Sequence, residues 1–248
     1  MPQVVRALFG RHHYVALNNM WRLYPKFSEY LWRYLTAKGQ YPCNVSVRTP
    51  AGLIQLDLYN PHDFLTVNEI FCRLDYQSDK NLNVVVDIGS NIGISARYFL
   101  SRNAFSKCYL FEPNPANINK LMKQLDGFEK RYILSDAAVA DRAGSFEFGI
   151  EESGRYGGIG VETGSSILVT CLDINSVLGD ILKKESRINI LKIDTEGVEI
   201  ATVKAIAPDI AKKIDRIYIE AQPSEALQPD IFSQIQYGSV CQLVNRII

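Results

Sequence analysis

The sequence lacks any long hydrophobic run. No stretch reaches the about 18 consecutive apolar residues of a membrane-spanning helix, so none is expected. It also lacks the apolar core of a secretory signal peptide, because basic or polar residues interrupt its amino-terminal segment: Arg6, Arg11, His12 and His13. We therefore expect a cytoplasmic protein, at most peripheral to the inner face of a membrane.

The chain also lacks net charge, since its 27 lysine and arginine residues balance its 27 acidic residues. A field that attracts nucleic acid is not expected, and nucleic acid is not a predicted partner. Cysteine is scarce: the five cysteines include no C-x-x-C pair. We expect them to be small buried apolar residues in a reducing compartment.

From residue 84 onward, short apolar runs alternate with segments of helical periodicity. The expected strands are Val84–Ile88, Lys107–Glu112, Tyr132–Val139, Asn189–Asp194 and Arg216–Glu220. The expected helices are 92–102, 115–125, 173–183, 197–206 and 225–236, with an extra antiparallel pair at Ser145–Ile150 and Ile167–Leu172 and a last strand near 239–246. This alternation predicts an α/β fold, with a mostly parallel, doubly wound sheet and helices on both faces.

The first third of the chain has a different pattern. Residues 1–80 are predicted to form a helical and β-hairpin extension of the domain at 81–248. Residues 43–59 alternate apolar and polar side chains twice around a turn sequence, which predicts the hairpin. A helix is expected at 64–76.

Residues 1–40 are rich in aromatic side chains at roughly helical spacing, and Pro25 is expected to divide them into two helices. They hold six basic residues against the single acid Glu29, a net charge of +5. Three interpretations stay open. The segment packs onto the other domain or a second subunit, contacts an anionic membrane surface or a lipid-linked substrate, or covers a substrate site.

The strongest local signal is VVVDIGSNIG at 84–93. Gly89 permits a sharp turn and close approach of a ligand to the backbone, and Gly93 lets the next helix pack on the strand. The glycines are spaced G-x-x-x-G, and not G-x-G-x-x-G as in dinucleotide sites. Asp87 precedes them and would repel a pyrophosphate, whereas it suits the amino group of S-adenosylmethionine.

Two further strand ends carry acids. Glu112, followed by Pro113, ends the second strand, where a carboxylate can accept hydrogen bonds from both hydroxyls of a ribose. Asp136 and Ala137 follow the third strand, where small residues leave room for an adenine and Asp136 can accept from its amine.

The fourth strand ends in LKIDTEGVE, which places three acids within six residues. Glu199 falls in the first turn of the next helix, where a carboxylate is also expected simply to cap the helix. Asp194 ends an apolar strand, and a solvated charge there has no structural purpose. We therefore expect Asp194 to be functional.

The segments VVVDIGSNIG, YLFEPNP, SDAAVAD and LKIDTEGVE resemble, in this order and spacing, the FkbM family of methyltransferases. Members of this family methylate hydroxyl oxygens of sugars, polyketides or related metabolites. The resemblance implies S-adenosyl-L-methionine as cofactor, bound among residues at the strand ends, and a substrate-side role for the acids of 194–199. The residues assigned to the cofactor site are Glu69, Asp87, Gly89, Ser90, Asn91, Gly93, Glu112, Pro113, Asp136 and Ala137.

The expected reaction is O-methylation of a hydroxyl on a sugar, glycan or related metabolite. A hydroxyl is a poor nucleophile at neutral pH, so Asp194 is the predicted general base and Glu196 the second candidate. The alternative is a divalent metal held by these acids, with oxygen ligands only, although no metal ligands are assigned. His62, and the glycine-rich loop 153–158 as a cover, are further candidates for the site.

Two rival classes remain at this point. A nicotinamide-dependent oxidoreductase is disfavoured by the glycine spacing and by the lack of a Tyr-x-x-x-Lys pair within the domain at 81–248. A catalytically inactive methyltransferase fold that serves as a binding module is disfavoured by the intact acids. A methyltransferase sheet usually ends in two strands after the fifth, and only one is visible here. Its final antiparallel strand is therefore expected to be absent or very brief.

Overall fold

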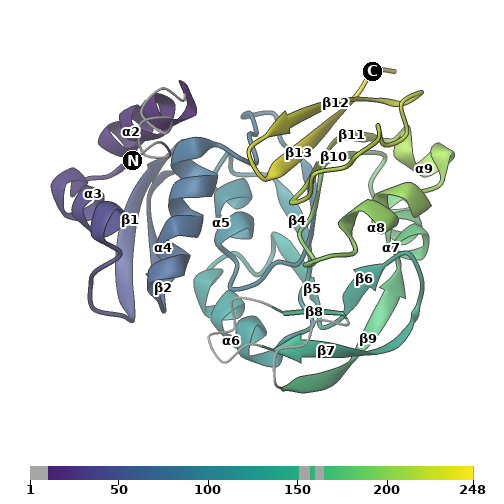
Figure 1. Cartoon of the computed structure of the whole chain (residues 1–248), viewed down its shortest axis with the longest axis horizontal. Coiled ribbons are helices and arrows are strands. Elements are labelled where there is room, and N and C mark those ends of the chain that lie inside the picture. Colours follow the sequence, from purple (N-terminus) through teal and green to yellow (C-terminus); the bar gives the residue numbers. More distant parts are fainter. Residues whose placement is uncertain (1–10, 151–156, 160–164, 248) are drawn as a thin grey trace. The chain divides into compact units, whose positions relative to one another are not determined.

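The computed structural model of the chain describes residues 11–150, 157–159 and 165–247 (Figure 1). The chain forms two compact units, Met1–Lys80 with Ser101–Ala104 and Asn81–Leu100 with Phe105–Ile248. Each unit has fully buried apolar side chains, such as Leu56 in the first and Ile193 in the second.

The N-terminal unit combines a β-hairpin with helices. β1 (Cys43–Thr49) pairs antiparallel with β2 (Gly52–Leu58), which confirms the predicted hairpin. The helical segments are α2 (Arg11–Leu23), α3 (Phe27–Thr36), α4 (Pro61–Val67) and the π-helical η1 (Asn68–Arg73). The helix predicted from residue 64 begins earlier, because the side chain of Asn60 accepts the N–H groups of His62 and Asp63 and caps α4.

Pro25 lies between α2 and α3, as predicted. The side chains of Tyr24 and Tyr30 are buried, and the Tyr24 hydroxyl donates to the side-chain oxygen of Asn68 at 3.0 Å. Trp21 and Trp32 are 67% and 51% exposed. Among the helices of the described residues, none has both the length and the apolar character needed to cross a membrane.

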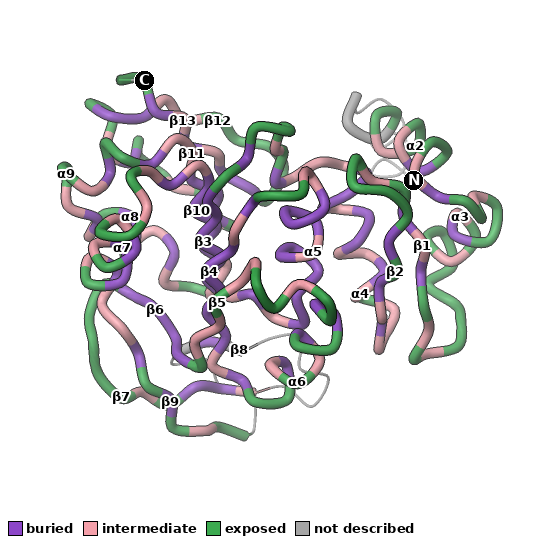
Figure 2. Tube along the Cα trace, turned by 180° about the vertical axis from the view of Figure 1, so that it is seen from behind, coloured by how far each residue is buried: buried purple, intermediate pink, exposed green. Residues whose placement is uncertain are grey.

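The second unit is built on a seven-stranded sheet. Its spatial order is β12 (Phe232–Tyr237), β13 (Val240–Asn245), β11 (Ile214–Ile219), β10 (Ile188–Ile193), β3 (Val84–Ile88), β4 (Lys107–Phe111) and β5 (Tyr132–Ser135). The strands from β11 to β5 are parallel, and β13 is antiparallel to both of its neighbours. Figure 2 shows buried residues along β10, β3 and β4. The predicted α/β fold with a mostly parallel sheet is confirmed.

The carboxyl-terminal end of the sheet corrects two predictions. The strand predicted near 239–246 is β13, but β12 occupies the place of the helix predicted at 225–236, so that helix is wrong. The sheet thus has both strands after β11, and the expectation of a missing or very brief strand is also wrong. Gln228 (φ 45°) interrupts the predicted helix, and Gly238 (φ 59°) makes the tight turn that pairs Tyr237 with Val240.

Helices cover both faces of the main sheet (Figure 1). α5 (Ile94–Leu100) and α6 (Pro115–Gln124) lie on one side. On the other lie α7 (Ile174–Leu182), α8 (Glu199–Ala205) and α9 (Pro208–Ala211).

A smaller sheet follows β5. Its order is β6 (Ala138–Ala140), β9 (Ser166–Asp173), β7 (Gly144–Ile150) and β8 (Gly157–Ile159). β7 and β9 are antiparallel, which confirms the predicted extra pair. The single strand predicted at 132–139 is instead divided between the two sheets, since β5 belongs to the first and β6 to the second.

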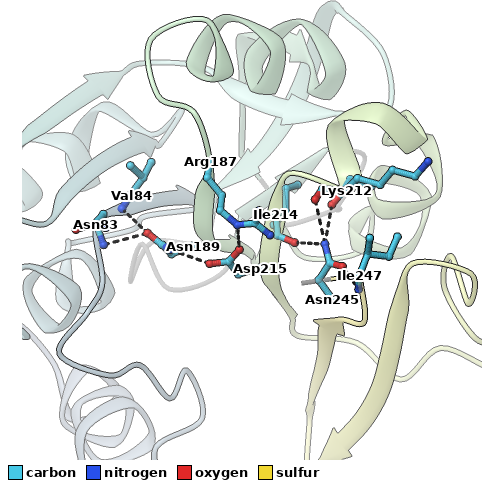
Figure 3. Close-up of polar contacts among 10 residues, drawn as sticks. Asn83, Val84, Arg187, Asn189, Lys212, Ile214, Asp215, Asn245 and Ile247 are labelled. Atoms are coloured by element: carbon cyan, nitrogen blue, oxygen red, sulfur yellow. Dashed lines mark hydrogen bonds and ion pairs between the residues drawn. The ribbon is translucent and has the colours of Figure 1, made fainter.

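Polar side chains fix the amino ends of the central strands (Figure 3). The side-chain oxygen of Asn189 accepts the N–H groups of Asn83 and Val84 at 3.0 and 2.9 Å, and its amide donates to Asp215 at 2.8 Å. The Asn245 amide donates to the carbonyl of Ile214 at 2.8 Å. These groups satisfy backbone atoms and join strands, so this edge of the sheet has a structural role.

Candidate active site

The acids predicted from the sequence lie at the opposite, carboxyl edge of the main sheet. β10, β3, β4 and β5 are parallel neighbours, so their carboxyl ends meet along one edge. Asp87 is the register partner of Lys192 on β10, and Phe111 is the partner of Ser135 on β5. The residues predicted after these four strands are therefore brought together.

The turn after β3 is packed against its neighbours on both sides. The N–H groups of Gly89 and Ser90 both donate to the carbonyl of Phe111 at 3.0 Å, and Asp194 N–H donates to the carbonyl of Ile88 at 3.0 Å. Gly89 has φ +77°, and a Cβ atom there would lie 1.8 Å from the carbonyl oxygen of Asp194. Only glycine fits at position 89, as the motif predicts.

Asn91 and Gly93 continue this turn. Asn91 has a left-handed backbone (φ 48°), and its N–H donates to Glu112 Oε2 at 2.8 Å. Gly93 has φ +85°, and a Cβ atom there would approach the side chain of Leu121 on α6 to 3.1 Å. The glycine therefore allows the start of α5 to pack closely against α6.

Backbone N–H groups hold the carboxylate of Glu112 in place. It is buried, and it accepts N–H groups from Asn91 at 2.8 Å and from Asn114 at 2.9 Å. Burial raises the pKa of Glu112 to about 7, although the N–H groups of Asn114 and Asn91 act in the opposite direction. The Asn117 side-chain amide also donates to Glu112 Oε1, at 3.5 Å. A carboxylate has about four acceptor sites, so Glu112 keeps one for a ligand hydroxyl.

The third strand end is more open. Asp136 is exposed directly after β5, and Ala137 is buried beside it. Pro113, which follows Glu112, is half-buried. At this strand end Ala137 is small and Asp136 supplies the acid, as the sequence predicts.

Asp87 differs from what its motif suggests, because its side chain is fully buried. Its Oδ2 accepts the hydroxyl of Ser95 at 2.6 Å, and its Oδ1 forms an ion pair with Lys192 Nζ at 3.0 Å. Burial raises the pKa of Asp87, while the Lys192 ammonium and the Ser95 hydroxyl oppose this effect. The carboxylate therefore already has a cation as its partner before any ligand binds.

Lys192 is the residue of this site that the sequence reasoning missed. It lies in the apolar strand β10 between Leu191 and Ile193, and only 3% of its side chain is exposed. Burial acts against its charge, but the carboxylates of Asp87 and Asp194 outweigh burial and raise the pKa of Lys192. The available signal was a lone lysine within an otherwise apolar strand, since such a charge is almost never buried without a partner.

The three acids after β10 have different surroundings. Asp194 Oδ2 lies 3.3 Å from Lys192 Nζ, and 28% of its side chain remains exposed. Glu199 is buried and accepts the N–H groups of Thr195 and Gly197 at 2.9 and 3.0 Å, so it shapes the loop, in keeping with the structural alternative. Glu196 is exposed with a left-handed backbone (φ 56°).

Three other candidates belong to other parts of the chain. Glu69 and His62 belong to the N-terminal unit, where Glu69 forms an ion pair with Arg73 at 3.5 Å. Most of the loop predicted as a cover lies outside the described residues, and its Gly157 and Gly158 belong to β8.

The site fits S-adenosylmethionine on its own chemistry. The turn at Gly89 ends β3, and the buried carboxylate of Glu112 at the next strand end suits a ribose hydroxyl. The parallel sheet and this arrangement of its strand ends define a methyltransferase of the Rossmann-like class that uses S-adenosylmethionine.

The family described as "Methyltransferase FkbM domain" matches residues 87–238, more than half of the chain. The chain therefore belongs to the FkbM methyltransferase family. This confirms the resemblance, and it favours the methyltransferase over the oxidoreductase alternative. No curated protein matches the sequence.

Solved structures with distant similarity include several methyltransferases. A methyltransferase from Geobacter sulfurreducens is 13% identical, with 74% of this chain and 79% of that chain covered and a TM-score of 0.40. TrmK of M. capricolum, solved with S-adenosyl-homocysteine, is 11% identical over 73% and 68%, with a TM-score of 0.37. A hypothetical protein of Thermus thermophilus is 11% identical over 79% and 96%, with a TM-score of 0.43.

Proposed function

We propose that the protein O-methylates a hydroxyl group of a sugar, glycan or related metabolite, with Asp194 as general base. The observation that carries this proposal is the environment of Asp194. One of its carboxylate oxygens is held by the buried Lys192, while 28% of its side chain is exposed beside the turn that contains Gly89. The FkbM family supports an oxygen acceptor.

In this proposal Glu112 and Asp136 bind the cofactor, and Asp194 accepts a proton. When bound, the cofactor supplies a methyl group on a positively charged sulfur. Glu112 would accept from the ribose and Asp136 from the adenine amine, which would orient the methyl donor toward the acceptor. Orientation of this kind lowers the barrier by about 7 kcal/mol or more. Asp194 would accept the proton of the acceptor hydroxyl as the methyl group is transferred to its oxygen.

A base is preferred here over a bound metal because of Lys192. A divalent cation shared by Asp87 and Asp194 would have to bind where the ammonium lies, at 3.0 Å from one carboxylate and 3.3 Å from the other. Among the described residues, no group of three or more His, Cys, Asp and Glu is arranged to hold a metal. Glu196 is the second candidate for the base, since it is exposed on the same loop.

The test compares cells with and without the gene by mass spectrometry of glycans and metabolites. The wild-type gene should add one methyl group to a hydroxyl-bearing product, and Asp194→Asn should fail to do so although the protein still binds S-adenosylmethionine. A methylated nitrogen, or full activity of Asp194→Asn, would contradict the proposal. A binding module without activity would bind the cofactor and leave every metabolite unchanged.

We place this reaction in the cytoplasm, where S-adenosylmethionine is made. The exposed Trp21 and Trp32, together with the basic charge of residues 1–40, support a contact with a membrane surface or a second copy of the chain. This contact stays a prediction.

A further inference from the structure

Lys192 has a position that is unusual for a charged residue. It lies one residue before the end of β10, in register with Asp87 on β3 and Tyr218 on β11, and its residue exposure is 2%. Lysine is almost never buried to this degree unless its ammonium group is paired. The fold therefore retains a charge here that an apolar side chain would replace if packing alone mattered.

The ammonium is surrounded by acceptors from two different strand ends. Lys192 Nζ donates to the carbonyl oxygen of Gly89 at 3.0 Å and forms ion pairs with Asp87 Oδ1 at 3.0 Å and Asp194 Oδ2 at 3.3 Å. The contact with Gly89 is a hydrogen bond, and the two carboxylates are held by charge. Gly89 and Asp194 belong to the two loops that lie against each other at the carboxyl edge.

The bond to Gly89 connects Lys192 to the ribose-binding carboxylate. The carbonyl of Gly89 is fixed by Lys192, and two residues later the N–H of Asn91 donates to Glu112 at 2.8 Å. A displacement of the turn would therefore also displace a donor from Glu112. The positive charge of Lys192 acts on Glu112 too, because it opposes the rise in its pKa that burial causes.

We propose that Lys192 is a positioning residue for the cofactor, which holds the turn at Gly89–Asn91 and the loop at Asp194 in the geometry that S-adenosylmethionine requires. It acts through these residues and not by touching the ligand. This role is independent of the acceptor and of Asp194 as a base.

The test uses Lys192→Met and Lys192→Arg, with calorimetric titration of S-adenosylmethionine and S-adenosylhomocysteine. Lys192→Met should weaken both ligands by the same factor, at least tenfold, because the turn is displaced for both. Lys192→Arg keeps the charge and should recover part of the affinity. Unchanged affinity for Lys192→Met would overturn the proposal. Tighter binding of S-adenosylmethionine alone would also overturn the proposal, because that result is expected if Lys192 acted only as a charge near the sulfonium.

A second readout distinguishes positioning from general loss of stability. The pH midpoint of cofactor affinity should move to higher pH in Lys192→Met, since Glu112 loses a favourable charge, and should stay near the wild-type value in Lys192→Arg. Asn189→Ala, at the far edge of the sheet, is the matched control. Urea unfolding should show that it also destabilises the protein, while its cofactor affinity and pH midpoint remain those of the wild type.

Lys192→Met leaves Asp87 buried without its counter-ion and can fail to fold. In that case the comparison is between Asp87→Asn and the double variant Asp87→Asn/Lys192→Met, in which the buried carboxylate is gone. Weaker cofactor binding by the double variant supports the proposal. Equal binding by the two, including none by either, overturns it, because Lys192 would then be only the counter-ion of Asp87.

Discussion

We expect Glu112 to make the affinity for S-adenosylmethionine depend on pH. Burial raises its pKa to about 7, so a large share of the ligand-free protein carries a proton on this carboxyl at neutral pH. Ribose hydroxyls donate to the ionised form and favour it, so binding should release that proton. For a pKa of about 7, the dissociation constant should be about tenfold higher at pH 6 than at pH 8, and about half a proton should be released at pH 7.

Calorimetry at pH 6, 7 and 8, in two buffers of different ionisation enthalpy, measures both the affinity and the proton release. Glu112→Gln is the control, because it removes this titration and keeps those of the cofactor and of the histidines. Its affinity should be lower at every pH, and the part of the pH dependence due to Glu112 should disappear. The reasoning is refuted if wild type and Glu112→Gln have the same pH dependence, since Glu112 would then not change its protonation on binding.

The protonation of Glu112 also affects the stability of the ligand-free protein. Its contribution to stability falls as the pH rises, whereas that of a salt-bridged acid rises with pH. The pKa of Glu112 is raised from 4.5, so its contribution to stability is fully present below pH 4.5 and is lost as the pH rises through about 7. The shift corresponds to a loss of roughly 3 kcal/mol in the free energy of unfolding. Urea unfolding at pH 5 and pH 8 should show a fall in the wild type that is smaller in Glu112→Gln.

The remaining predictions concern three positions at the two edges of the sheet and one control position in α7. Gly89→Ala places a Cβ atom 1.8 Å from Asp194 and should abolish cofactor binding in calorimetry, whereas Gly179→Ala, in a helix with open space around it, should raise the free energy of unfolding by about 1 kcal/mol. Wild-type affinity in Gly89→Ala would contradict the packing of the two loops. Asp194→Asn should leave the cofactor dissociation constant within about twofold and lower turnover by roughly 100-fold or more, a result that normal turnover would exclude. Asn245→Ala loses its bond to Ile214 and should lower the free energy of unfolding by about 1–3 kcal/mol in urea titration, with unchanged cofactor affinity.

The positions of the acids at the strand ends follow from the sequence because they depend on local order. Apolar strands with an acid at or next to their carboxyl ends place Asp87, Glu112, Asp136 and Asp194 at one edge once the strands are parallel. The family resemblance adds the cofactor. This part of the site is determined by residues close together in the sequence.

The features of the site that could not be predicted from the sequence depend on pairing between strands that are far apart in the sequence. Lys192 and Asp87 are 105 positions apart, and only their register places the ammonium against the carboxylate. The acid at the glycine turn was therefore interpreted as facing a ligand, whereas the structure shows it buried with a cation. The helix predicted at 225–236 is replaced by β12, because pairing with β13 decides the conformation of this segment.

The connection between the two sheets has a consequence for how the enzyme can evolve. β5 ends at Ser135 and β6 begins at Ala138, so the chain passes from one sheet to the other through Asp136 and Ala137 alone. These two residues are also assigned to the adenine. Changes in the smaller sheet that shift β6 should thus also move these two residues, and we expect variation there to concentrate in β7 and β8, which β9 separates from β6.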